Sequence, residues 1–348
     1  MKVRNEIMNK YEIVKDMTKT IKDEYGKEIT LYRIRALKDI DNTLPIHKGD
    51  LGGWVEKEEN LSQEGNCWIY NNAVVYDNAK VISNGTVFGD VVVSGYAIVS
   101  GNGTVFGDVV VSGYAIVSGN AKVSGNAEVH GDAEVYGDAR VYGNAEVHGD
   151  ARVYGDAEVY GDARVYGDAR VYGNAEVYDN AEVYDNAEVY DNTIVLGDAE
   201  VYGDARVYGD ARVYGNAEVY GNAEVYDNAE VYDNTIVLGD ARVYGDAEVH
   251  GDAEVYGDAR VYGNAEISND AIINSNEDYT TIRGFGTKQR HTTFYRCKDN
   301  NIRVKCSCFN GTIDEFREQV KNTREGKIAR EYLEIADLME RHFKESDE

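Results

Sequence analysis

An aliphatic residue returns at every sixth position from Ile69 to Ile273 without a slip, which gives 35 consecutive hexads. A small residue, usually Ala, stands two positions before each aliphatic residue, and a Gly-Asp, Gly-Asn or Asp-Asn pair usually begins two positions after it. Residues 135–140, Val-Tyr-Gly-Asp-Ala-Arg, are typical. Because side chains i and i−2 share one face of a strand, each hexad predicts an inward Ala and Val beside outward polar or aromatic neighbours.

The pair after each strand predicts a corner. Gly accepts positive φ freely, and Asp and Asn tolerate the left-handed region better than other residues. Short strands repeated at hexapeptide spacing are the signature of a parallel β-helix. Residues 84–101 recur letter for letter as residues 102–119, a duplication of three hexads, which predicts a triangular coil of 18 residues. The hexads would then make about 12 coils.

This pattern resembles the hexapeptide-repeat left-handed parallel β-helix. The resemblance alone implies the left hand, since parallel crossovers in general are right-handed. Residues 51–79 contain Gly-Gly-Trp-Val-Glu, Asn-Leu-Ser and Gly-Asn-Cys-Trp, which resemble the entry segment of bacterial and prophage hexapeptide-repeat proteins often named as acyltransferases. The expected fold is therefore an all-β solenoid.

Three regions are predicted: an N-terminal β-hairpin and cap over residues 1–60, the β-helix over 61–276, and an α+β module over 277–348. Two strands are expected within residues 11–40, joined near Gly26. An open β-helix end exposes unpaired backbone groups, so we interpret Trp54 and Trp68 as part of a cap rather than a ligand site.

The C-terminal module is expected to hold a hairpin and two helices. Residues 279–309 suggest the hairpin, with strands at 291–297 and 302–309. The capping-box spacing of Thr312 and Glu315 predicts a helix to about Val320. A second helix is expected over residues 327–343, with an apolar stripe. The module resembles C-terminal modules of phage and prophage proteins, and its role is left open between capping the far end and docking a partner. The stripe consists of Ile328, Tyr332, Ile335, Met339 and Phe343.

Four cysteines are too few for a disulfide framework in a chain of 348 residues. Cys67 stands at an inward small position, and Ile302, Val304, Cys306 and Cys308 alternate as if on one face of a strand. We interpret these thiols as core packing, because a zinc site needs four ligands. No metal site is predicted.

The negative charge is concentrated in the repeat. Residues 1–68 carry 12 basic and 13 acidic residues and residues 277–348 carry 14 of each, which leaves 10 basic and 36 acidic residues between them. Such an excess argues against direct binding to nucleic acids or anionic membranes. There is no signal-peptide pattern and no apolar run long enough to span a membrane, so a cytoplasmic or virion-associated protein is expected.

Outward positions 18 residues apart should form columns. The first column has Tyr after the inward Val eight times in succession, beside a column in which Glu and Arg partly alternate, so that opposite charges should pair across strands. A second face, with Glu128, Glu146, Arg164, Glu182, Glu200 and Glu218, should be repulsive. The candidate binding face comprises Tyr136, Tyr154, Tyr172, Tyr190, Tyr208, Tyr226, Tyr244 and Tyr262 with Arg152, Arg170, Arg206, Arg242 and Arg260.

Tyr and Arg favour protein interfaces, but Tyr is also a good strand former that stacks on its own neighbours, and this second interpretation is preferred. A protein partner is expected at the Tyr face or at the C-terminal module. The preferred function is a non-catalytic structural or interaction scaffold of bacterial or prophage type, without a cofactor.

Two alternatives remain open. The resemblance implies a trimeric acyltransferase that uses acyl-CoA or an acyl carrier, with His130 and His148, which should lie on adjacent coils, as weak catalytic candidates. The uninterrupted hexads offer no inserted loop to shape a cleft, and codon drift from Tyr explains these histidines and His250 more simply. The second alternative is an acidic decoy that imitates a phosphate backbone and binds a DNA-binding protein.

Overall fold

The computed structural model describes residues 9–23, 25–42, 44–286 and 289–345. The chain divides into two compact units, Met1–Asn180 and Ala181–Glu348. In both units the repeat forms three parallel sheets in which residue i pairs with residue i+18, as for Glu134 with Arg152 and Glu224 with Arg242. This register confirms the predicted three-sided parallel β-solenoid, with about 12 coils in the two units together. The left-handedness of the coils stays an expectation from the resemblance to hexapeptide-repeat β-helices.

The first unit carries the N-terminal strands on one of its three sheets. The first sheet runs β1 (Tyr11–Lys22), β2 (Glu28–Ala36), β3 (Leu51–Val55), β5 (Val74–Val75), β8 (Val92–Val93), β11 (Val110–Val111), β14 (Glu128–Val129), β17 (Glu146–Val147), β20 (Arg164–Val165). The second contains β4 (Trp68–Ile69), β7 (Thr86–Gly89), β10 (Thr104–Gly107), β13 (Lys122–Gly125), β16 (Arg140–Val141), β19 (Glu158–Val159), β22 (Glu176–Val177). The third contains β6 (Lys80–Val81), β9 (Ile98–Val99), β12 (Ile116–Val117), β15 (Glu134–Val135), β18 (Arg152–Val153), β21 (Arg170–Val171).

The second unit continues the same three-strand period. Its first sheet contains β23 (Glu182–Val183), β26 (Glu200–Val201), β29 (Glu218–Val219), β32 (Ile236–Val237), β35 (Glu254–Val255), β38 (Ile272–Ile273). Its second contains β25 (Ile194–Val195), β28 (Arg212–Val213), β31 (Glu230–Val231), β34 (Glu248–Val249), β37 (Glu266–Ile267). Its third contains β24 (Glu188–Val189), β27 (Arg206–Val207), β30 (Glu224–Val225), β33 (Arg242–Val243), β36 (Arg260–Val261).

The interior of the coils is filled as the hexads predict. The inward Val and Ala side chains have essentially no exposed surface. Thr193 and Thr235 replace Ala at two inward positions, and each buried hydroxyl donates a 2.7 Å hydrogen bond to a turn carbonyl, of Tyr190 and Tyr232 respectively. A buried hydroxyl is tolerated only when it is bonded in this way.

The corners have the predicted backbone geometry. Gly137 has φ of +74° and Asp179 has φ of +60°. Corner amides also stack from coil to coil: Asn120 Nδ2 donates to Asp138 Oδ1 at 2.7 Å, and Asn222 to Asp240 at 2.8 Å. An Asn placed against an Asp supplies a donor where two carboxylates would repel.

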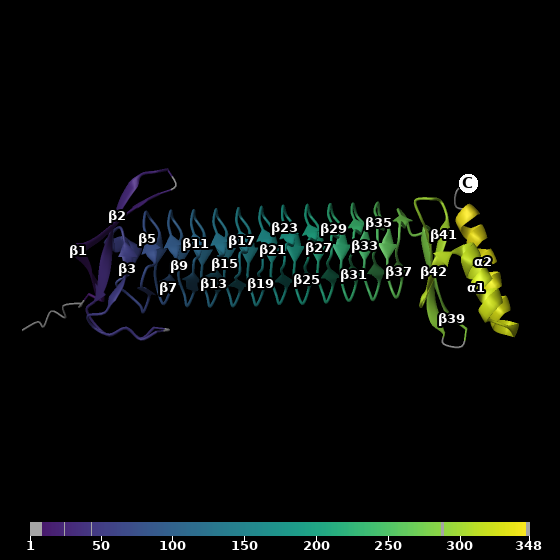
Figure 1. Cartoon of the computed structure of the whole chain (residues 1–348), viewed down its shortest axis with the longest axis horizontal. Coiled ribbons are helices and arrows are strands. Elements are labelled where there is room, and N and C mark those ends of the chain that lie inside the picture. The colour runs from purple at the N-terminus through teal and green to yellow at the C-terminus, as the bar shows by residue number, and fades with distance from the viewer. Residues whose placement is uncertain (1–8, 24, 43, 287–288, 346–348) are drawn as a thin grey trace, which may run out of the picture. The chain divides into compact units, whose positions relative to one another are not determined.

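The predicted N-terminal hairpin is confirmed by β1 and β2, which pair antiparallel (Figure 1). The short 3-10 helix η1 (Glu58–Asn60) follows β3. Trp68 is buried and meets the Tyr11 ring edge-on at 6.4 Å, while Trp54 packs with a cluster that includes Leu31 of β2. Both tryptophans therefore serve packing of the hairpin onto the first coils.

The Gly-Gly pair before Trp54 has a steric cause. A Cβ on Gly52 would lie 2.6 Å from the carbonyl oxygen of Ile69, and one on Gly53 would lie 2.4 Å from the Ile69 side chain. The β3 backbone thus runs too close to the first coil for any side chain at these two positions.

The C-terminal module has a four-stranded antiparallel sheet, β39 (Tyr279–Phe285), β40 (Arg290–Arg296), β41 (Ile302–Cys306) and β42 (Phe309–Thr312), beside α1 (Ile313–Thr323) and α2 (Gly326–Glu345) (Figure 1). The predicted hairpin and both helices are present. The capping box is also confirmed, since the Thr312 hydroxyl accepts from the Glu315 amide at 3.2 Å and the Glu315 carboxylate accepts from the Thr312 amide at 2.8 Å.

Two expectations for this module need correction. β39 and β42 add strands that the sequence did not predict. Cys308 does not continue the buried face of Ile302 and Val304, because the chain turns at Ser307, where φ is +57°, and leaves Cys308 exposed. In the predicted helical stripe, Tyr332, Met339 and Phe343 are buried, whereas Ile328 and Ile335 are partly buried against the same core.

Hydrogen bonds attach the C-terminal sheet to the last coil of the second unit. The hydroxyls of Tyr295 and Ser268 lie 2.9 Å apart, both buried, and Tyr279 Oη donates to the carbonyl of Arg260 at 2.7 Å. Lys305 Nζ also lies 2.5 Å from Glu266 Oε1. These contacts pack the C-terminal sheet against the end of the last coil.

Candidate functional site

The predicted tyrosine columns exist within both units. In the first unit Tyr136, Tyr154 and Tyr172 stack with ring centroids 4.9 and 4.8 Å apart and planes within 3° of parallel. In the second unit the stack comprises Tyr190, Tyr208, Tyr226, Tyr244 and Tyr262. Each ring inside a stack has both faces covered by its neighbours, so only ring edges and hydroxyls remain for a ligand.

The stack of the second unit is closed at its last member. Tyr262 keeps 51% of its surface exposed, and the Tyr279 ring meets it edge-on at 6.4 Å. Between their stacked rings the columns therefore leave no gap into which a sugar or an aromatic ligand could insert. Binding to the Tyr face stays a prediction, limited by this geometry to edge contacts.

The charged column beside the tyrosines pairs as predicted at several points. Glu224 lies between two arginines, with carboxylate oxygens 3.9 Å from Arg206 Nη1 and 3.4 Å from Arg242 Nε. Arg152 Nε lies 3.8 Å from Glu134. Arg170 and Arg260 begin β21 and β36 at the equivalent positions of the column.

The second face is not simply repulsive. Tyr184 donates to the Glu200 carboxylate at 2.7 Å, and Tyr202 donates to Glu218 at 3.2 Å. Arg164 lies 3.8 Å from Glu146. The tyrosine hydroxyl of one coil thus donates a hydrogen bond to the glutamate carboxylate of the next coil. The order of charges within one column does not predict this contact, because the Tyr and the Glu belong to neighbouring columns.

The third face repeats this tyrosine–glutamate arrangement. Tyr142 donates to Glu158 at 3.0 Å, and burial in the stack, reinforced by Glu158, raises the pKa of Tyr142 to about 12. The same causes raise the pKa of Tyr160 beside Glu176. A raised pKa keeps these phenols protonated as donors, which makes them poor general bases near neutral pH.

The histidines behave as members of the aromatic stacks. His130 and His148 stack with centroids 4.9 Å apart and planes 3° from parallel, and His148 stacks on Tyr166 at 5.1 Å. The predicted adjacency is confirmed, and both rings occupy ordinary Tyr positions. A catalytic role for these two histidines stays a prediction.

His250 has more distinctive surroundings than the other two. It stacks on Tyr232 at 4.8 Å, and its ring nitrogens lie 3.9 Å from Asp233 and 3.7 Å from Glu266. Although burial raises the pKa of Glu266, contacts from His250 and Lys305 outweigh it and lower that pKa below its ordinary value. Lys305 comes from β41, so this cluster joins the last coils to the C-terminal module.

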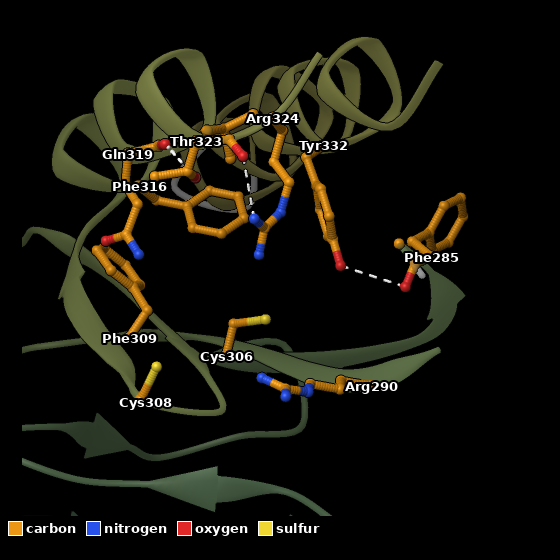
Figure 2. A pocket seen from close by; sticks show the side chains of 12 residues that line it. Phe285, Arg290, Cys306, Cys308, Phe309, Phe316, Gln319, Thr323, Arg324 and Tyr332 are labelled. Carbon is orange, nitrogen blue, oxygen red and sulfur yellow. Dashed lines mark hydrogen bonds between the residues drawn. The ribbon is translucent and has the colours of Figure 1, made fainter. Parts of the chain in front are cut away.

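A cavity of about 400 Å³ lies between the C-terminal sheet and the two helices (Figure 2). Cys306 lies on its sheet side and Tyr332 on its helical side, and Arg290 and Arg324 project toward it from opposite sides (Figure 2). Sequence reasoning missed this cavity, because its residues come together only when the helices pack on the sheet. The remaining lining residues are Phe285, Gly286, Cys308, Phe309, Phe316, Gln319, Val320 and Thr323.

Four stretches of the coils match a family model described as the YdcK β-solenoid repeat, at residues 133–149, 157–173, 163–179 and 199–215. The repeats are similar to those of YdcK. The Escherichia coli (strain K12) protein named "Uncharacterized acetyltransferase YdcK" is 35% identical over 81 residues, which are 23% of this chain and 24% of that protein.

The similarity to YdcK thus spans about a quarter of each chain, and the family model matches only coils. The Gly-Gly-Trp-Val-Glu segment, the C-terminal module and the cavity lie outside the residues that match the YdcK repeat. The comparisons support a β-solenoid repeat related to a protein named as an acetyltransferase.

Among the described residues no three or more His, Cys, Asp or Glu side chains are grouped so as to hold a metal ion. No helix in the described ranges is long and apolar enough to cross a membrane.

Proposed function

We propose that this chain is a non-catalytic β-solenoid scaffold, whose coils are structural and whose recognition of a partner or ligand belongs to the C-terminal module. One observation carries this proposal: the outward aromatic residues, including His130 and His148, are occupied in stacking on the next coil. The spacing of six residues from Ile69 to Ile273 also leaves no inserted loop to build a cleft over them.

A test should separate catalysis from folding. His130→Tyr and His148→Tyr install the ordinary residue of the aromatic column, so they should keep the stack while removing the imidazole. We expect the wild-type chain and both variants to release no free CoA from acetyl-CoA, measured by thiol detection with a panel of amine and hydroxyl acceptors. CoA release by the wild type that disappears in these variants would overturn the scaffold proposal.

The second candidate is an acyltransferase that uses acyl-CoA or an acyl carrier and acts as a homotrimer. The similarity to the E. coli protein named as an acetyltransferase favours it. Under this proposal a cleft between subunits would place a histidine beside the acyl group. Analytical ultracentrifugation tests its first requirement, since a monomer at all accessible concentrations contradicts a site shared between three subunits.

A further inference from the structure

The cavity of the C-terminal module differs electrostatically from the rest of the chain. The protein has 63 acidic and 36 basic residues, yet among the described residues the cavity is lined by two arginines and by no Asp or Glu. Arg290 begins β40, and Arg324 directly follows α1, so each wall of the cavity supplies one guanidinium (Figure 2).

Three other arginines of the module form ion pairs. Arg296 pairs with Asp278 at 3.2 Å, Arg303 with Asp299 at 3.5 Å, and Arg317 with Asp314 at 2.8 Å. Within the described residues, neither Arg290 nor Arg324 lies within 4.0 Å of a carboxylate oxygen. Two positive charges therefore face one cavity without an internal counterion.

The pKa of the Tyr332 phenol is affected by both arginines. Burial raises the pKa of Tyr332, with smaller contributions in the same direction from Cys306 and Glu331, whereas Arg324 and Arg290 both oppose this rise. Tyr332 Oη donates to the carbonyl of Phe285 at 3.2 Å, and Arg324 Nη1 donates to the carbonyl of Thr323 at 3.0 Å. The hydroxyl and one guanidinium are thus held in place at the cavity (Figure 2).

The rest of the lining is mixed, with aromatic rings beside the polar side chains of Gln319 and Thr323. Phe316 packs against Phe309 at 5.4 Å and against Tyr332 at 5.7 Å, the latter edge to face. Cys306 and Val320 complete this surface. Ligand sites typically have volumes of about 300–1,000 Å³. The volume of this cavity, about 400 Å³, falls within that range.

We propose that this pocket binds a small organic anion, with its carboxylate or phosphate held by Arg290 and Arg324 and its ring-sized apolar body packed against Phe309, Phe316 and Tyr332. Guanidinium groups bind both oxyanions through charge-assisted hydrogen bonds, so the shared chemistry is the anionic group on an apolar body. This assignment does not depend on whether the solenoid itself catalyses a reaction.

Benzoate and phenyl phosphate test the proposal on the full chain, with benzamide and inorganic phosphate as probes that lack the charge or the ring. We expect one or both of the aromatic anions to bind in isothermal titration and to outcompete benzamide and inorganic phosphate. The tighter of the two identifies the oxyanion. Equal binding of benzamide and benzoate, or no binding of either aromatic anion at millimolar concentration, would overturn the proposal.

Variants locate the binding site. Arg290→Gln and Arg324→Gln should each weaken binding by about tenfold, as expected for the loss of a charge-assisted bond. Arg330→Gln, on the exposed surface of α2, makes the same change in net charge outside the cavity and should leave affinity unchanged. Unchanged affinity in the double variant Arg290→Gln/Arg324→Gln contradicts the assignment.

The thiols provide a second readout. Cys306 and Cys308 line the cavity, whereas Cys67 and Cys297 are buried elsewhere. Bound ligand should slow the alkylation of Cys306 by iodoacetamide, measured by peptide mass spectrometry, in the wild type and in Arg330→Gln. Alkylation of Cys306 that is insensitive to a bound aromatic anion would place that anion elsewhere and refute the site.

Discussion

The corner residues carry the tightest local constraint in the repeat. Gly119 has φ of +67°, and a Cβ there would lie 2.8 Å from the backbone nitrogen of Gly137 on the next coil. Gly263 has nearly the same φ, +71°, but a Cβ there would meet nothing within 4 Å. This pair separates the cost of the backbone conformation from the cost of close stacking.

Gly119→Ala should therefore destabilise the protein more than Gly263→Ala. A left-handed conformation costs an L-residue roughly 1–2 kcal/mol, and both variants incur this cost. Gly119→Ala adds a contact with the backbone of the next coil, which cannot move without disturbing the ladder. Urea midpoints followed by circular dichroism measure the difference, and equal midpoints would show that the close approach relaxes freely.

Single residues also mark where sequence reasoning stopped. Cys67 is predicted to point inward and is buried. Nothing in the sequence indicates that the fully buried Lys10 places its ammonium 3.0 Å from the Cys67 sulfur and 3.0 Å from the Cys67 carbonyl oxygen. Burial lowers the pKa of Lys10. Such a contact depends on how the hairpin folds back over the first coil, which periodicity does not encode.

At the scale of elements, local sequence patterns predict those strands and helices whose geometry depends only on their own residues. The hexad spacing predicts every inward Val, and the pair Thr312 and Glu315 predicts the start of α1, because each pattern depends on residues that are close in sequence. β39 and β42 were missed because their partners, Thr280 with Phe294 and Lys305 with Asn310, are set by pairing across the sheet. The cavity was missed for the same reason, since Arg290 and Tyr332 meet only through tertiary packing.

The charged column of the second unit makes a prediction about strand pairs. Glu224→Gln removes a carboxylate that lies between Arg206 and Arg242, whereas Glu134→Gln removes one paired with Arg152. Partly exposed pairs contribute up to about 1 kcal/mol, so Glu224→Gln should lower the melting temperature more. The difference should shrink in about 1 M salt, where the Debye length falls to about 3 Å. Identical shifts at low salt would contradict a role for the flanking arginines.

The junction between the last coil and the C-terminal sheet depends on buried hydroxyls. Tyr295→Phe removes one buried hydrogen bond of Ser268, whose hydroxyl still accepts from Asn310 Nδ2 at 3.0 Å. The loss of one such bond costs about 0.5–1.5 kcal/mol. We expect a lower melting temperature and faster amide hydrogen exchange in β37 and β38. Tyr114→Phe is the matched control, because Tyr114 is 60% exposed and its substitution should leave the melting temperature unchanged. Unchanged exchange in Tyr295→Phe would show that the sheet is held by other contacts.

For the whole molecule, the repeated tyrosines set the response to alkaline pH. Burial in the stacks, with nearby carboxylates, raises the pKa of Tyr142, Tyr208 and Tyr232 from 10.0 to about 12. The unfolded chain releases these protons from about pH 10, while the folded chain retains them until about pH 12. Unfolding therefore releases protons in this window, so this contribution to stability is complete below pH 10 and is lost as pH rises toward 12.

The free energy of unfolding should thus fall steeply between pH 10 and 12, further assisted by self-repulsion in a chain whose formal charge is already −27 at pH 7. Tyr208→Phe/Tyr232→Phe tests the cause, because the chain itself stacks Phe88 on Phe106 at 5.0 Å in an equivalent column. This variant should match the wild type near pH 8 and lose less stability above pH 10, in denaturant titrations read with tyrosinate absorbance. An identical loss in both proteins would assign alkaline unfolding to groups outside the stacks.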